Sequence, residues 1–89
     1  MKVIKRDGRV TDFDQSKIKL AIEKANKEVS RKEKASKEDI KAIIEYIEEL
    51  NKKRILVEDI QDIIEEKLME LGRHELAKKY IVYRYTRAL

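Results

Sequence analysis

Apolar residues recur with helical spacing in four segments of the chain. A spacing of three and four residues places apolar side chains along one face of a helix. The pattern therefore predicts four amphipathic helices that share a core. In chain order the four sets are Ile18, Ala21, Ile22, Ala25 and Val29; Ile40, Ile43, Ile44, Ile47 and Leu50; Ile60, Ile63, Ile64, Leu68 and Leu71; and Leu76, Ala77, Tyr80 and Ile81.

The N-terminal residues up to Phe13 follow a different pattern, which predicts a β-hairpin. Two short runs of β-branched and charged residues flank the dipeptide Asp7-Gly8. This dipeptide is typical of a two-residue type I′ turn, in which glycine supplies a positive φ. Such a turn would place Lys5 opposite Val10, so that neither face of the hairpin would be purely apolar.

Capping residues predict where three of the helices begin or end. Asp14 precedes the first apolar set and is a good N-cap, because its side chain can accept from a free backbone N–H. Ser36 and Asp39 have the spacing of a capping box at the start of the second helix. Gly72 follows the third set and suits the residue after a helix end, where φ is positive. The segment 30–35 breaks the helical period and predicts a polar connection.

A short third strand is expected beside the hairpin, because residues 54–57 are apolar and partly β-branched. The predicted fold class is α+β, with an N-terminal β-hairpin and this third strand packed on about four α-helices. A chain of 89 residues has room for one hydrophobic core. We therefore expect a single domain that spans residues 1–89.

Composition narrows the chemistry that the chain can carry. Cysteine is absent and His74 is the single histidine, so we expect no disulfide, no thiolate nucleophile and no metal site. The two glycines, Gly8 and Gly72, lie far apart, which excludes the loop of a P-loop NTPase. No motif places a base beside a serine, and the acidic pairs are typical of helix faces. No enzyme activity is therefore expected.

The net charge of +4 suits an anionic ligand, whether a nucleotide, a phosphate or a nucleic acid. Lysine-rich, solvated helices would show the same excess without any ligand. No apolar run approaches the ~20 residues of a membrane span, and the N-terminus does not have the pattern of a signal peptide. We therefore expect a soluble, cytoplasmic protein.

Three basic elements lie where folding alone does not require them. Lys17 falls in the first turn of the first helix, where a cation opposes the helix dipole by about 0.3–1 kcal/mol and a bound phosphate would reverse that effect. Arg84 and Arg87 continue the apolar face of the last helix, either to bind phosphate oxygens or to complement the helix end. Lys5 and Arg6 precede the turn and would bind an anion or protect an edge strand. Together these elements predict one shared anion site.

Three segments follow one another in a fixed order along essentially the whole chain. They are Val3-Ile4-Lys5-Arg6-Asp7-Gly8 with Phe13-Asp14 and Lys17-Ile18; Val57-Glu58-Asp59-Ile60-Gln61; and Tyr80-Ile81-Val82-Tyr83-Arg84 with Arg87. Together these segments resemble the ATP-cone. Domains of this family occur at the N-terminus of many ribonucleotide reductases and in the bacterial repressor of ribonucleotide reductase genes. They bind ATP or dATP and change the oligomeric state of the protein to which they are attached.

The resemblance implies an adenine nucleotide, ATP or dATP with Mg²⁺, that lies between the sheet and the helices. It assigns the base and the sugar to Val3, Phe13, Asp14, Ile18 and Gln61. Asp14 would accept from the exocyclic amine, and Gln61 would lie near the sugar. The resemblance assigns the triphosphate to Lys5, Arg6, Lys17, Arg84 and Arg87.

Two departures from the family pattern leave the preference between ATP and dATP open. Thr11 stands where some members have Glu, and Val57 stands where many have Ser or Thr. The implied partners are a ribonucleotide reductase subunit or repressor and a second copy of the chain that contacts helix surfaces. One alternative is a small basic nucleic-acid-binding domain, although a recognition-helix motif is absent. The other is an engineered scaffold that keeps the fold without the site.

Overall fold

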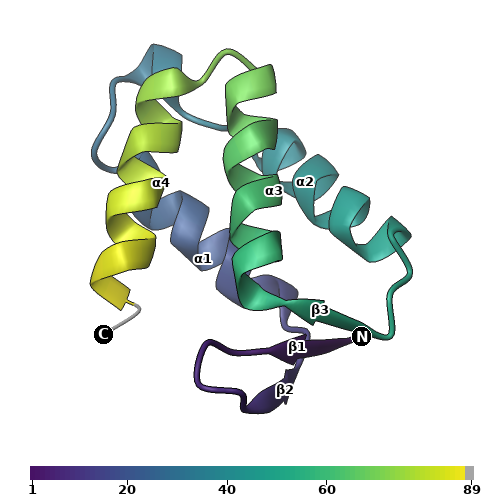
Figure 1. Cartoon of the computed structure of the whole chain (residues 1–89). Helices are drawn as coiled ribbons and strands as arrows, with labels where there is room; N and C mark the ends of the chain where they lie inside the picture. The colour runs from purple at the N-terminus through teal and green to yellow at the C-terminus, as the bar shows by residue number, and fades with distance from the viewer. Residues whose placement is uncertain (88–89) are drawn as a thin grey trace.

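The computed structural model describes the backbone of residues 1–87 and the side chains of residues 1–85. A three-stranded sheet lies at one end of the molecule, and the helices stack on one of its faces (Figure 1). The predicted α+β class is therefore confirmed. The elements are β1 (Lys2–Ile4), β2 (Val10–Asp12), α1 (Gln15–Asn26), the 3-10 helix η1 (Arg31–Glu33), α2 (Lys37–Glu49), β3 (Arg54–Leu56), α3 (Val57–Glu70) and α4 (His74–Arg87).

The hairpin turn differs from the predicted two-residue turn. The backbone N–H of Lys5 donates to the carbonyl of Arg9 at 2.8 Å, and that of Gly8 donates to the carbonyl of Lys5 at 2.9 Å. The loop therefore has three residues and ends at Gly8, whose φ is 88°. Asp7 does not share that positive φ, as a type I′ turn would require. Its carboxylate instead accepts from the Arg9 backbone N–H at 3.1 Å and from Arg9 Nε at 2.6 Å.

This turn shifts the strand register by one residue from the predicted one. Val3 lies opposite Thr11, and Ile4 lies opposite Val10. A shift of one residue exchanges the two faces of a strand. Val3, Thr11 and Lys5 therefore share the face that meets the helices, and the prediction that Lys5 lies opposite Val10 was wrong.

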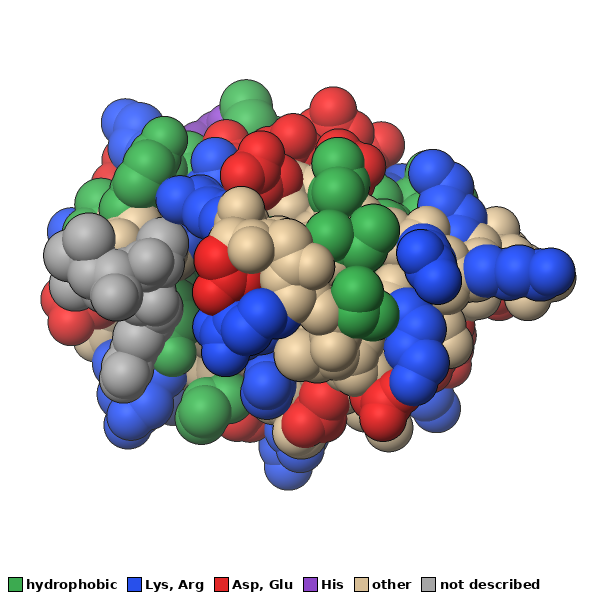
Figure 2. Space-filling model, turned by 60° about the horizontal axis from the view of Figure 1, so that its bottom comes forward, with side chains coloured by type: hydrophobic (Ala, Val, Ile, Leu, Met, Phe, Trp, Pro, Cys, Tyr) green, Lys and Arg blue, Asp and Glu red, His purple; other side chains and the backbone are tan. Residues whose placement is uncertain are grey.

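The third strand is confirmed at Arg54–Leu56, where it pairs in parallel with β1 and makes β1 the central strand. Ile55 is 3% exposed and Val3 is 8% exposed on the helix side of the sheet. On the other side Leu56 and Val10 are about half-exposed. Figure 2 views the molecule from this end, where apolar side chains lie beside groups of Lys and Arg.

The predicted caps are confirmed. Asp14 Oδ1 accepts from the Ser16 backbone N–H at 3.0 Å at the start of α1. Ser36 and Asp39 form the reciprocal capping box of α2, with hydrogen bonds of 3.0 and 2.9 Å. Gly72, with φ 76°, follows the end of α3. These local signals were readable because each acts within one turn of its helix.

The connection between α1 and α2 is more ordered than its polar sequence predicts. It contains the 3-10 helix η1, and Ala35 at its end is buried. The Asn26 side chain donates to the Ala35 carbonyl at 3.1 Å and accepts from the Ala35 N–H at 3.0 Å. One amide thus ties the end of α1 to the start of α2.

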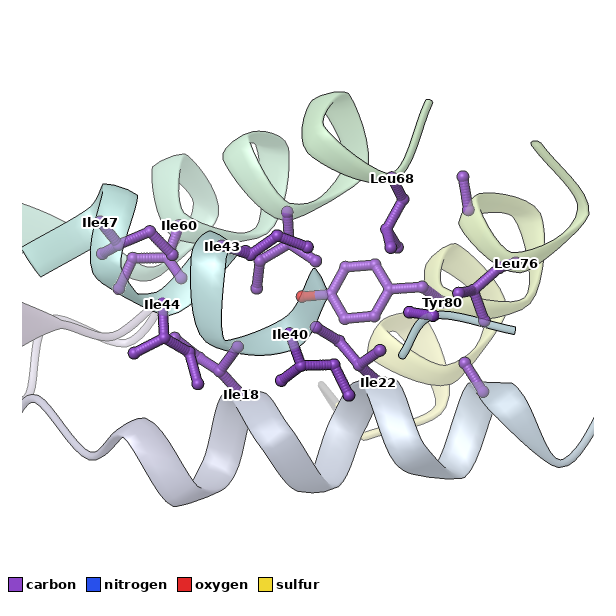
Figure 3. Packing of buried hydrophobic residues seen from close by; sticks show 14 of the residues in the cluster. Ile18, Ile22, Ile40, Ile43, Ile44, Ile47, Ile60, Leu68, Leu76 and Tyr80 are labelled. Carbon is purple, nitrogen blue, oxygen red and sulfur yellow. The ribbon is translucent and has the colours of Figure 1, made fainter. Parts of the chain in front are cut away.

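The core is one cluster of apolar side chains from the sheet and all four α-helices (Figure 3). α1 and α3 both pack against α4, so the three helices enclose a shared interior. Among the described residues, no helix is both long enough and apolar enough to cross a membrane. The fully buried side chains are Ile22, Ile47, Ile64, Leu68 and Leu76.

Candidate functional site

A cleft of about 510 Å³ lies between the sheet, α1, α3 and α4. Its floor is apolar and almost completely buried, whereas its mouth is polar and exposed. The exposed residues at the mouth include Asp12, Asp14, Lys17 and Leu20. The floor consists of Val3, Ile18, Ile60, Ile64 and Tyr80.

The cleft collects most of the residues that the sequence predicts for a nucleotide site. They come from β1, from the start of α1 and from the first turns of α3, which are separate in the sequence and adjacent in the fold. The register of the hairpin is what turns the strand residues toward the helices. The predicted residues that line the cleft are Val3, Lys5, Phe13, Asp14, Lys17, Ile18 and Gln61.

Two lysines supply positive charge at the cleft. Lys17 is exposed in the first turn of α1, and Lys5 is half-buried just after β1. Within residues 1–85 neither lysine forms an ion pair. Their charges are therefore available to an anion.

Asp14 is the acidic residue of the cleft that also caps α1. Its Oδ1 accepts from the Ser16 hydroxyl at 2.6 Å as well as from the Ser16 N–H. The Ser16 hydroxyl, then the Ser16 N–H and the Lys17 charge, hold the pKa of Asp14 below its usual value. Asp14 is therefore ionised at neutral pH, and Oδ2 is the oxygen left for a ligand.

Arg84 lies beside the cleft in a setting that the sequence does not predict. Its side chain is only 15% exposed, with Asp62 Oδ1 at 3.5 Å and Glu65 Oε2 at 3.7 Å. Its Nη1 donates to Gln61 Oε1 at 3.3 Å. Two carboxylates thus already oppose the Arg84 charge, although its Nε is buried with no hydrogen-bond partner among the described residues.

Of the other two predicted arginines, the one that the structure describes does not line the cleft. Arg6 is exposed at the hairpin loop, and its Nε lies 3.5 Å from Glu58 Oε1. Arg87 belongs to α4, but its side chain lies outside the described residues.

Several residues of the cleft could not be assigned to it from the sequence. Ile60 and Ile64 fit the apolar pattern of α3, which does not distinguish the floor of a cleft from a closed core. Tyr80 and Tyr83 also line the cleft. The one available signal was the helical spacing that placed Tyr80 in the apolar set of the last helix.

A second hollow, of about 440 Å³, lies between the start of α1 and α2. Its lining mixes lysines with glutamates, so the charges there oppose one another. It contains none of the predicted site residues. The charged residues that line it are Lys19, Lys37, Lys41, Glu45 and Glu48.

Comparison with known proteins identifies the family. The chain matches the ATP cone domain over residues 1–89. It is 38% identical over 99 residues to the ribonucleoside-diphosphate reductase subunit alpha of Chlamydia trachomatis, a match that covers 99% of this chain and 10% of the relative. It is 36% identical over 88 residues to the vitamin B12-dependent ribonucleoside-diphosphate reductase of Mycobacterium tuberculosis, covering 98% of this chain and 12% of the relative.

A third similar protein is the vitamin B12-dependent ribonucleoside-diphosphate reductase of Thermoplasma acidophilum. It is 38% identical over 91 residues, which cover 96% of this chain and 12% of the relative. The chain thus spans about a tenth of the length of these curated relatives. Because the family match extends over residues 1–89, the chain belongs to the ATP-cone family.

Proposed function

We propose that this chain is a regulatory domain that binds ATP or dATP in the cleft between the sheet, α1, α3 and α4. The observation that carries this proposal is the convergence of seven predicted residues on one cleft, from the hairpin, the start of α1 and α3. Membership of the ATP-cone family supports the same nucleotide-binding, regulatory role. The chain itself performs no catalysis in this account.

The two ends of a nucleotide match the two parts of the cleft. The floor of isoleucine, valine and tyrosine side chains suits a purine base, which loses little by leaving water. Lys5 and Lys17 suit a triphosphate. A phosphate near the start of α1 would also meet free N–H groups and the positive end of the helix dipole. Bound phosphate would then offset the unfavourable position of Lys17.

Gln61 is assigned to the sugar, and Arg84 is assigned to the orientation of Gln61. A guanidinium group only donates hydrogen bonds, so the Gln61 atom that faces Arg84 is the amide oxygen. The Gln61 amide nitrogen is then the group left to donate to a sugar oxygen. In this proposal Arg84 acts through Gln61.

Magnesium would reach this site with the nucleotide. Mg²⁺ keeps several waters and binds phosphate oxygens readily, with one or two protein carboxylates at most. Among the described residues, no group of three His, Cys, Asp or Glu side chains could hold a metal ion. The donor set therefore fits an ion carried by the triphosphate.

Regulation would follow if ATP and dATP stabilise different packings of the helix surfaces. A ligand shifts such an equilibrium only by its difference in affinity for the two states. The attached or partner protein would be a ribonucleotide reductase subunit or repressor, because the similar proteins are reductases. The same helix surfaces would form contacts between copies of the chain.

Calorimetric titration of the chain with ATP and with dATP tests this proposal. We expect both nucleotides to bind, with the affinity reduced in Lys17→Ala and retained in Lys19→Ala. These two lysines are exposed on the same helix, but only Lys17 lines the cleft. Absence of binding by either nucleotide at millimolar concentration would overturn the proposal. Salt-sensitive binding of duplex DNA with indifference to nucleotides would support the nucleic-acid alternative.

A further inference from the structure

Tyr80 places a hydroxyl group at the buried end of the cleft. The residue is 3% exposed, yet it lines the cleft together with Ile18, Ile60 and Ile64. In Figure 3 its ring extends from α4 into the interior, and the oxygen points away from α4 toward the isoleucines of the neighbouring helices. The side chains of the cleft floor are otherwise hydrocarbon, so the Tyr80 hydroxyl is their one polar group.

The surroundings of this hydroxyl keep it neutral. Burial raises the pKa of Tyr80 well above its ordinary value of 10.0, and the nearby Arg84 charge lowers that pKa by less. The Glu65 and Asp62 charges raise it further. The phenol therefore retains its proton at physiological pH and can donate a hydrogen bond.

The core offers this hydroxyl no polar side chain. Among the described residues, every buried side chain apart from Tyr80 itself is hydrocarbon. The buried side-chain atoms without a hydrogen-bond partner are Glu65 Oε2 and Arg84 Nε among the described residues, and the Tyr80 oxygen is not one of them. Because Tyr80 lines the cleft, a ligand that fills the cleft can replace water as the partner of this oxygen. A hydroxyl at this position is explained if a ligand supplies the partner.

We propose that the Tyr80 hydroxyl donates a hydrogen bond to a ring nitrogen of the purine that binds in the cleft. This inference rests on the proposed function and makes Tyr80 a residue that determines base specificity. Aromatic ring nitrogens of purines carry a lone pair that accepts from a neutral donor. Carbon at the same ring position has no lone pair and cannot accept.

The base, rather than the triphosphate, is the part of the ligand that fits this end of the cleft. Lys17 lies at the exposed mouth, whereas Val3, Ile64 and Tyr80 are at least nine-tenths buried. A phosphate on the floor would lose its hydration among apolar side chains, and the nearby Arg84 charge is already opposed by Asp62 and Glu65. A planar, neutral ring loses much less than a phosphate on this apolar surface, and the hydroxyl supplies one of its donors.

Calorimetry with single-atom analogues of ATP tests the assignment. The ligands are ATP, 1-deaza-ATP, 3-deaza-ATP and 7-deaza-ATP, each titrated into the unchanged chain and into Tyr80→Phe. We expect Tyr80→Phe to bind ATP about three- to tenfold more weakly, the scale of one neutral hydrogen bond. The analogue that lacks the accepting nitrogen should bind the unchanged chain more weakly than ATP does, by the same factor. Tyr80→Phe should bind that analogue as tightly as the unchanged chain binds it.

Tyr85→Phe is the matched control, because Tyr85 lies on α4, is exposed and does not line the cleft. It should bind all four ligands as the unchanged chain does. If Tyr80→Phe binds ATP normally, or loses the same factor for ATP and for all three analogues, the assignment is wrong. If ATP fails to bind the unchanged chain, the proposed function itself fails.

A measurement on the unchanged chain covers the case in which Tyr80→Phe does not fold. The chain has four tyrosines, so ¹³C at the ring carbon that carries the hydroxyl gives few signals. We expect the Tyr80 signal to shift with ATP and to stay in place with inorganic tripolyphosphate, which lacks the base. An unchanged Tyr80 signal in the presence of saturating ATP would overturn the inference.

Discussion

The two sides of the cleft carry positive charge in opposite settings. On the hairpin side, Lys5 and Lys17 form no ion pair within residues 1–85. On the α4 side, Arg84 is largely buried beside Asp62 and Glu65. A charge that is already neutralised contributes little to ligand binding and more to the structure. The comparison supports the proposal that the hairpin side binds the phosphates, whereas the α4 side holds Gln61 in place.

The largest effect on stability is expected for Arg84→Met. This change keeps much of the apolar stem but leaves the half-buried Glu65 near Asp62 without its cation. We expect a loss of about 1–3 kcal/mol in the free energy of unfolding, measured by urea denaturation. Lys78→Met, which removes an exposed cation from the same helix, should change that free energy by less than about 0.5 kcal/mol. Unchanged stability together with lost ATP affinity would show that Arg84 serves the ligand directly.

For Lys5→Ala we expect the main effect on ATP binding rather than on stability. The loss of one charge-assisted phosphate contact should weaken ATP binding by about 1–3 kcal/mol, while the free energy of unfolding changes by less than about 0.5 kcal/mol. Calorimetry and urea denaturation on the same samples measure the two quantities. Lys52→Ala is the control, because Lys52 is exposed, forms no ion pair within residues 1–85 and does not line the cleft. Equal losses of affinity for the two variants would contradict the role given to Lys5.

A smaller effect is expected for Lys17→Ala, which should raise the free energy of unfolding when no nucleotide is bound. Lys17 opposes the positive end of the α1 dipole, so its removal should stabilise the free chain by about 0.3–1 kcal/mol. Saturating ATP should reverse the order, because the unchanged chain then gains the phosphate contact. Thermal unfolding with and without ATP measures both states. A variant that is less stable than the unchanged chain in both states would rule out this conflict between folding and binding.

The smallest effect concerns the pH dependence of Asp14. Its pKa is lowered in the folded chain from the ordinary value of 3.8, so the stability that it contributes is present above pH 3.8. That contribution is lost as the pH falls through the lower, folded pKa. Asp14→Asn retains a capping oxygen but does not titrate. Thermal unfolding between pH 2 and 7 should therefore decline less steeply for Asp14→Asn, and parallel profiles would contradict the assignment.

Local signals in the sequence were enough to predict most of the fold. The capping box at Ser36 and the helix end at Gly72 act over a few residues, and the structure has both where they were expected. The hairpin register was missed because it depends on which of Asp7 and Gly8 takes a positive φ. Only Gly8 does so, and the Asp7 carboxylate instead holds Arg9.

The candidate site was predictable where strand and helix ends converge, and less so where helices pack. Lys5, Lys17 and Gln61 lie on short motifs and reach the cleft as expected. The partners of Arg84 belong to α3, about twenty residues earlier in the chain, and depend on how α3 and α4 meet. No spacing rule within one helix reveals such a contact.

The central claim is that an adenine nucleotide binds in the cleft between hairpin and helices. Its most direct test is a titration of the ¹⁵N-labelled chain with ATP and Mg²⁺, followed by NMR. We predict that the backbone signals of Val3, Lys5, Lys17 and Gln61 shift together, while those of Lys37 and Glu45 at the second hollow stay in place. Shifts centred on the second hollow, or no shifts at millimolar ATP, would contradict this account.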